Sequence, residues 1–172
     1  LAFGLESLGY DTPTIRRRVA EMASFFGIQT WFYKSVTELS GGQKQLLNLA
    51  SVMVLQPKVL ILDEPTSQLD PIAASDFLAT LGKINRELGT TIILTEHRLE
   101  EAFSFASRVA VMDGGRLLCS GTPAEVGAEL KSSGNAMFLA IPAAMRIWAA
   151  TDSKAVCPIS VCDGRNWLLE YA

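Results

Sequence analysis

The feature that most constrains the fold of this chain is a short, unbroken apolar run at residues 59–62 that ends in two carboxylates, Asp63 and Glu64. A run of this length without polar alternation is typical of a parallel strand buried on both faces. A second such run occupies residues 91–95, and a helical pattern that begins after Asp70 separates the two. Strands that alternate with helices predict a parallel α/β sheet.

The flanking segments predict further helices and one hairpin, because proline, glycine and capping residues mark where elements start and stop. We expect additional helices at residues 12–26, 41–55 and 96–105, and one more after a capping-box pattern at residues 122–125. The turn sequence Asp113-Gly114-Gly115 predicts a hairpin between strands at residues 109–112 and 117–119. The alanine-rich tail that follows predicts an extension or a linker.

Composition argues against several classes of protein. The formal net charge of −3 leaves no basic footprint, so we do not expect nucleic acid as a partner. The longest apolar run, residues 136–145, contains Pro142 and is too short to cross a bilayer. Three cysteines and a single histidine, His97, form neither a disulfide framework nor a zinc-ligand pattern. The first residue is Leu1 and not methionine, which fits either a fragment or a processed chain.

About twenty residues before the carboxylates, the chain reads Leu39-Ser40-Gly41-Gly42-Gln43. Two glycines at the start of a predicted helix offer backbone N–H groups to an anion without side-chain obstruction. Ser40 is also a good N-cap and the glycines a turn, and both interpretations can hold at once.

The order and spacing of these motifs resemble the second half of an ATP-binding cassette (ABC) ATPase. The resemblance identifies residues 39–43 as the signature motif, 59–65 as the Walker B strand, 67–70 as the D-loop, and His97 as the switch histidine. No G-x-x-x-x-G-K-[ST] phosphate loop occurs in residues 1–172, although nucleotide binding in that family depends on one. We therefore expect this chain alone to hydrolyse no ATP.

The resemblance implies a role for each site residue. Asp63 would hold Mg²⁺ and Glu64 would polarise the attacking water, which suits phosphoryl transfer. Without the resemblance, Asp-Glu-Pro merely opens a solvated loop. His97 would donate to the γ-phosphate of ATP and hold Glu64 in place. Residues 40–43 would meet the γ-phosphate of a nucleotide bound by the opposite subunit, namely Ser40, Gly41, Gly42 and Gln43. Asp70 would couple the two ATP sites, although it also fits an ordinary helix cap.

The implied fold is the later half of a P-loop NTPase (RecA-like) parallel sheet with a helical signature subdomain, and without the N-terminal strands. We place the helical subdomain at residues 1–56, the later part of the ATPase core at 57–128, and an extension or linker at 129–172. With the first strands missing, an edge and an apolar face of the sheet would be exposed, so we expect self-association.

Several segments most resemble the ATPases of energy-coupling-factor (ECF) importers, which take up vitamins or metal ions: residues 3–6, 45–50 and 67–71. This subfamily implies a second ABC ATPase domain and a membrane coupling subunit as partners, at the cytoplasmic face of the cell membrane. Two alternatives stay open. One is a naturally truncated, non-catalytic cassette that acts as an interaction module, and the other is a soluble ABC ATPase without a transporter.

Overall fold

The computed structural model describes residues 1–97, 99–151 and 153–171, and it divides into two compact units, Leu1–Glu96 and His97–Ala172. Each unit has its own hydrophobic core. Among the described residues, no helix has the length and apolar character needed to cross a membrane.

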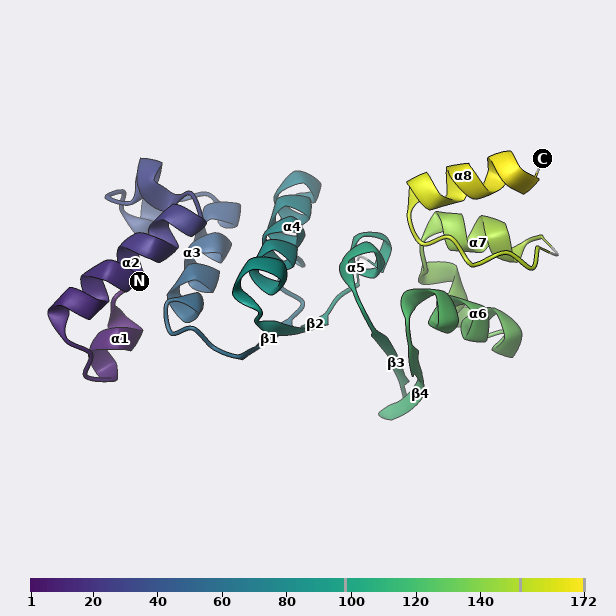
Figure 1. Ribbon diagram of the computed structural model, residues 1–172, viewed down its shortest axis with the longest axis horizontal. Helices are drawn as coiled ribbons and strands as arrows, with labels where there is room; N and C mark the ends of the chain where they lie inside the picture. The colour runs from purple at the N-terminus through teal and green to yellow at the C-terminus, as the bar shows by residue number, and fades with distance from the viewer. Residues whose placement is uncertain (98, 152, 172) are drawn as a thin grey trace. The chain divides into compact units, whose positions relative to one another are not determined.

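The first unit joins a helical segment to two strands (Figure 1). Its elements are α1 (Phe3–Ser7), α2 (Thr12–Phe25), the 3₁₀ turns η1 (Ile28–Trp31) and η2 (Val36–Glu38), α3 (Gly41–Met53), β1 (Val59–Asp63), α4 (Pro71–Leu88) and β2 (Thr91–Thr95). The predicted helices and strands of this unit are therefore present, with boundaries that differ by one or two residues.

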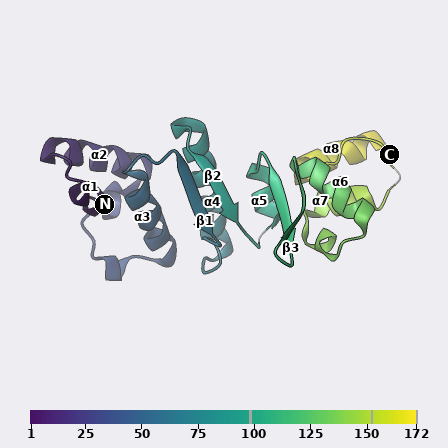
Figure 2. The ribbon, with the colours of Figure 1, turned by 90° about the horizontal axis from the view of Figure 1, so that it is seen from below.

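Strands β1 and β2 pair in parallel, as the sequence pattern predicted, with Val59 opposite Thr91 and Asp63 opposite Thr95. Figure 2 shows the two strands side by side with α4. One face of the pair packs into the core that α4 shares, through Leu60, which is 5% exposed. Parallel pairing brings the carboxyl ends of both strands to the same edge, and this places the candidate site.

The opposite face of this two-stranded sheet is exposed. The expectation from the apolar runs that both faces are buried is therefore wrong, whereas the expected exposed apolar face of a sheet without its first strands is present. Val59, Ile61 and Ile93 are 51%, 71% and 52% exposed. The physical reason is the pleat, because alternate residues point to opposite faces and only one face has a helix against it. Below we call these three residues the exposed sheet face.

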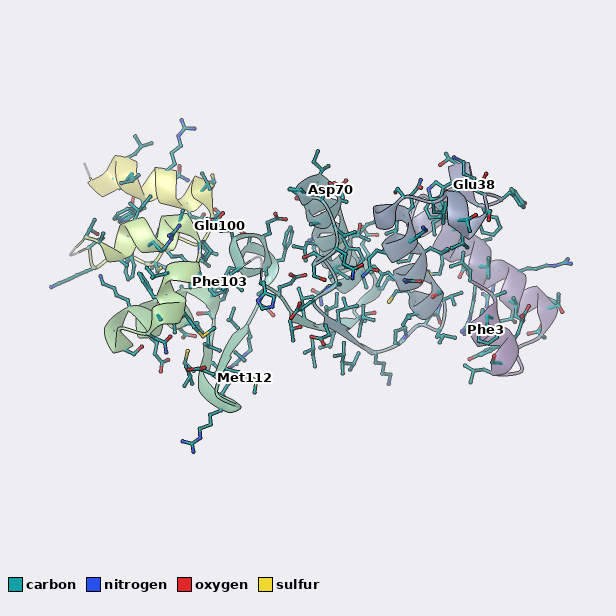
Figure 3. All side chains as sticks on the ribbon, turned by 180° about the vertical axis from the view of Figure 1, so that it is seen from behind. Phe3, Glu38, Asp70, Glu100, Phe103 and Met112 are labelled. Atoms are coloured by element: carbon teal, nitrogen blue, oxygen red, sulfur yellow. The ribbon has the colours of Figure 1, made fainter. Side chains whose placement is uncertain are left out.

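The second unit contains α5 (Leu99–Phe105), a hairpin of β3 (Val109–Asp113) and β4 (Arg116–Gly121), then α6 (Pro123–Ser133), η3 (Ala136–Ala140), α7 (Ala143–Ala149) and α8 (Val161–Tyr171). The strands of the hairpin are antiparallel, as predicted. Met112 and Glu100, labelled in Figure 3, mark the hairpin and α5. The capping box at Thr122 is also confirmed, since Thr122 and Glu125 each hydrogen-bond the other's backbone N–H.

Helices α7 and α8 and turn η3 lie in the tail, for which the sequence pattern predicted an extension or a linker and assigned no elements. They contribute Met145, Trp148 and Trp167 to the same core as α6. A Cβ on Gly127 of α6 would lie 2.1 Å from Cε of Met145, so α6 and α7 approach closely at a residue without a side chain. This packing orders the tail.

Candidate functional site

The two candidate carboxylates lie where β1 ends, and Thr95 of the neighbouring strand contacts both residues. The hydroxyl of Thr95 donates a hydrogen bond to Oδ1 of Asp63 over 2.5 Å. The backbone N–H of Glu64 is 3.1 Å from the hydroxyl oxygen of Thr95 and 3.1 Å from its carbonyl oxygen. Both carboxylate residues are exposed, so ligands in solvent can reach them. Sequence patterning had used Thr95 only as the end of a strand and missed this role.

Glu64 has left-handed backbone geometry, with φ of 44°. Residues other than glycine rarely adopt this region, and such strain is concentrated at functional sites. The turn that follows is closed by two hydrogen bonds, from Ser67 N–H to the Glu64 carbonyl and from Leu69 N–H to the Thr66 carbonyl. The chain therefore turns sharply directly after Glu64.

The start of α3 is a complete capping box. The Ser40 hydroxyl oxygen accepts from Gln43 N–H at 3.2 Å, and Gln43 Oε1 accepts from Ser40 N–H at 3.0 Å. Lys44 N–H donates to the Ser40 carbonyl. Of the amides that a helix start leaves without an intrahelical partner, those of Gly41 and Gly42 remain for a ligand.

The two glycines differ in their surroundings. A Cβ on Gly41 would meet no atom within 4 Å, whereas a Cβ on Gly42 would lie 3.3 Å from Cβ of Ala73 on α4. A side chain at Gly42 would thus crowd Ala73 of α4, whereas Gly41 leaves an open approach to the first turn of α3. Packing alone gives no reason for a glycine at position 41.

Asp70, labelled in Figure 3, is the N-cap of α4, and its carboxylate accepts from Ala73 N–H at 2.9 Å. The capping role considered in the sequence is therefore present. Whether Asp70 also couples two nucleotide sites stays a prediction.

His97 follows β2 by two residues, is exposed, and is the first residue of the second unit. The two units are described separately, so the predicted action of His97 on Glu64 stays a prediction. Within the first unit, a hydrogen bond joins α3 to the turn after β1, since Gln45 Nε2 donates to the Pro65 carbonyl at 3.0 Å.

The residues fit a magnesium ion shared with a phosphate better than a metal held by protein alone. Over residues 1–97, 99–151 and 153–171, no group of three or more His, Cys, Asp or Glu side chains could hold a metal. Mg²⁺ is usually bound through one or two carboxylates together with water and substrate phosphates. An exposed Asp63 with one oxygen fixed by Thr95 suits that kind of site.

Comparison with protein families matches residues 5–67 to the ABC transporter family. A putative ABC transporter ATP-binding protein of Bacillus anthracis is 55% identical over 130 residues, which are 76% of this chain and 24% of that protein. The energy-coupling factor transporter ATP-binding protein EcfA1 of Caldanaerobacter subterraneus is 42% identical over 133 residues, 76% of this chain and 47% of that protein.

Solved structures agree with these matches. CbiO1 from Clostridium perfringens, part of the ABC transporter complex cbiONQ, has a TM-score of 0.69 and 38% identity, over 78% of this chain and 54% of that one. An ATP-binding cassette of an ABC transporter in its ADP conformation has a TM-score of 0.65 and 21% identity, over 76% of this chain and 50% of the other, which supports the fold alone. The chain thus spans about a quarter of the length of the first curated relatives it matches.

Proposed function

We propose that the chain carries the later portion of an ABC transporter ATPase domain, and that it supplies the signature motif and the hydrolytic carboxylate of an ATPase that drives import across a membrane. The arrangement of Asp63, Glu64 and Thr95 at the carboxyl edge of the parallel strands is the observation that carries this proposal. One threonine fixes a metal-binding carboxylate and the backbone of the next residue together.

In this proposal Asp63 binds Mg²⁺, which neutralises charge on the phosphates of ATP. The Thr95 hydroxyl orients Asp63 by donating to Oδ1, and the other carboxylate oxygen of Asp63 would hold the ion. Glu64 accepts a hydrogen bond from the attacking water and aligns it with the γ-phosphate, which is the positioning that phosphoryl transfer requires. His97 donates to the γ-phosphate and holds Glu64.

The start of α3 would contact the ATP that a second cassette binds, and not the ATP on which Glu64 acts. Amides of Gly41 and Gly42 and the hydroxyl hydrogen of Ser40 donate to the γ-phosphate of ATP bound by a second cassette, with Gln43 holding the capping box closed. A phosphate loop has no counterpart in residues 1–172 and comes from elsewhere in the assembly. Below, the whole ATPase means these 172 residues together with the segment that carries that loop.

The transport role belongs to the same proposal. Similarity to EcfA1 and CbiO1 favours ECF-type uptake of a vitamin or metal ion, with a second ATPase domain and a membrane coupling subunit as partners at the cytoplasmic face of the membrane. Affinity purification of the whole ATPase from detergent-solubilised membranes tests this. We expect an integral membrane protein to co-purify in stoichiometric amount, and co-purification of ribosomes instead would favour a soluble ABC ATPase.

The hydrolytic role is tested by steady-state ATP hydrolysis of the whole ATPase. We expect Glu64→Gln to lower the rate on the order of 10²–10⁴-fold, the range for loss of a general base. Glu87→Gln, an exposed glutamate on α4, is the matched control and should keep the wild-type rate. An active Glu64→Gln variant would contradict the role of Glu64.

A further inference from the structure

The turn between Glu64 and Asp70 is held by side chains from two other elements. Pro65 and Thr66 are both buried at the centre of this turn, and Thr66 is 0% exposed. The Thr66 hydroxyl has no hydrogen-bond partner among the described residues. The side chain of Thr66 therefore adds no hydrogen bond to the turn. Besides the two backbone hydrogen bonds within the turn, side chains from α3 and from the end of β2 bond its backbone.

Gln45 provides the first of these contacts. It lies on α3, five residues after the signature serine, and its side-chain amide donates to the Pro65 carbonyl at 3.0 Å in a part-buried position. This bond joins α3 to the turn after Glu64. In the proposed assembly, the first turn of α3 contacts the nucleotide bound by the second cassette, whereas Glu64 acts on the nucleotide bound by its own cassette.

Glu96 provides the second contact. It is the residue directly after β2, and its Oε1 accepts from Thr66 N–H at 3.2 Å, also part-buried. A hydrogen bond to a charged acceptor is among the stronger ones in proteins. Together with the bonds from Glu64 N–H to Thr95, these contacts engage successive backbone polar groups from Glu64 to Thr66.

We propose that Gln45 and Glu96 are positioning residues for hydrolysis: they clamp the backbone on the carboxyl side of Glu64, so that its carboxylate points in one direction. Because Gln45 lies on α3, its hydrogen bond connects this helix directly to the residue after Glu64. This inference rests on the proposed ATPase function, and it adds two residues that do not touch nucleotide themselves.

Gln45 donates in its contact and Glu96 accepts in its own, so exchanging amide and carboxylate should affect the two contacts differently. Gln45→Glu keeps the size of the side chain but replaces the donating amide with an oxygen facing the Pro65 carbonyl. Glu96→Gln keeps an oxygen that can accept from Thr66 N–H. We expect kcat of the whole ATPase to fall about tenfold in Gln45→Glu, and to stay within about threefold of wild type in Glu96→Gln.

Removing each side chain completes the series. Gln45→Ala and Glu96→Ala should each lower kcat about tenfold, while KM for ATP changes less than about twofold, because the phosphate anchor lies elsewhere. Asn48→Ala, an exposed residue of the same helix, is the control and should match wild type. Wild-type kcat in both Gln45→Glu and Glu96→Ala would overturn the proposal.

Amide hydrogen exchange of the 172-residue chain provides a readout independent of ATP hydrolysis. We expect the amides of residues 66–69 to exchange about tenfold faster than in wild type in Gln45→Glu and Glu96→Ala. In Asn48→Ala their exchange rates should equal those of wild type. Faster exchange with unchanged kcat would show a purely structural contact and overturn the positioning role. Failure of the proposed function is distinguishable, since wild type would then hydrolyse no ATP while the exchange pattern still held.

Discussion

The hydroxyl of Thr95 donates a hydrogen bond to Asp63 Oδ1 across 2.5 Å, joining residues that are paired in register at the ends of two parallel strands. The same hydroxyl oxygen lies 3.1 Å from the backbone N–H of Glu64. One side chain thus fixes the position of both candidate carboxylate residues. The first prediction follows from this arrangement.

Thr95→Val removes both hydrogen bonds while keeping a β-branched side chain of similar volume. We expect the free energy of unfolding of the first unit to fall by about 1–2 kcal/mol, as for loss of hydrogen bonds to a charged group. Urea unfolding followed by circular dichroism measures this. Thr91→Val, on the exposed start of the same strand, is the control, and Thr95→Ser should restore most of the loss. Equal stability of Thr95→Val and wild type would contradict the structural role.

Gly41→Ala separates folding from ligand binding at the signature helix. Its new Cβ meets no atom within 4 Å, and alanine favours helix, so we expect stability to be unchanged or to rise by up to about 1 kcal/mol. In the whole ATPase the same Cβ obstructs the approach of the phosphate, and the rate of ATP hydrolysis should fall at least about tenfold.

Ser40→Ala should change stability in the opposite direction to Gly41→Ala. It removes the capping hydroxyl and should lower the free energy of unfolding by about 1 kcal/mol. If Gly41→Ala hydrolysed ATP at the wild-type rate, the glycine would serve the helix start only.

The exposed sheet face predicts that the 172-residue chain self-associates. Ile61 is 71% exposed beside Ile93, and strands with unpaired edges and apolar faces recruit further strands. Light scattering should show a mass that rises with concentration, and Ile61→Lys should lower it. Val156→Lys, an 83% exposed residue outside the sheet, is the control. A monomer at every concentration tested would contradict this prediction.

Burial predicts an order of reactivity for the three free cysteines. Burial raises the pKa of the Cys157 thiol to about 11, with Lys131 opposing the shift in part, and burial also raises the pKa of Cys119. A raised thiol pKa favours the neutral form, so at pH 8 roughly one Cys157 in a thousand is thiolate. Exposed Cys162 should therefore react with iodoacetamide first.

Mass spectrometry of labelled peptides measures that order, and the rate at Cys157 should rise about tenfold per pH unit up to about pH 11. In Cys162→Ser, labelling at pH 8 should become slow. Rapid labelling of Cys157 at pH 8 would show that the core of the second unit opens.

Local signals in the sequence predicted much of the fold. The capping boxes at Ser40 and Thr122 lie within four residues of chain, so their hydrogen bonds follow from neighbouring residue types. The parallel pairing of β1 and β2 followed from apolar runs separated by a helix. The apolar run alone did not indicate that Ile61 is exposed, since burial depends on what covers the sheet. The expectation of an exposed apolar face came from the missing first strands.

Features that depend on distant residues escaped the sequence analysis. Gln45 and Pro65 are twenty residues apart, and Thr66 and Glu96 are thirty apart, so no local pattern indicates that they touch. The close packing of Gly127 against Met145, which orders the tail, is of the same kind. The proposed roles of Asp63 and Glu64 came from the order of the motifs, and the structure adds the hydrogen bonds of Thr95 to both residues.

The most direct test of the account compares ATP hydrolysis by the 172-residue chain and by the whole ATPase under identical conditions, each with and without Glu64→Gln. We predict no turnover by the chain alone, and turnover by the whole ATPase that Glu64→Gln lowers at least about 100-fold. Steady turnover by the chain alone that Glu64→Gln removes, or turnover by the whole ATPase that stays near the wild-type rate in Glu64→Gln, would contradict the proposed roles.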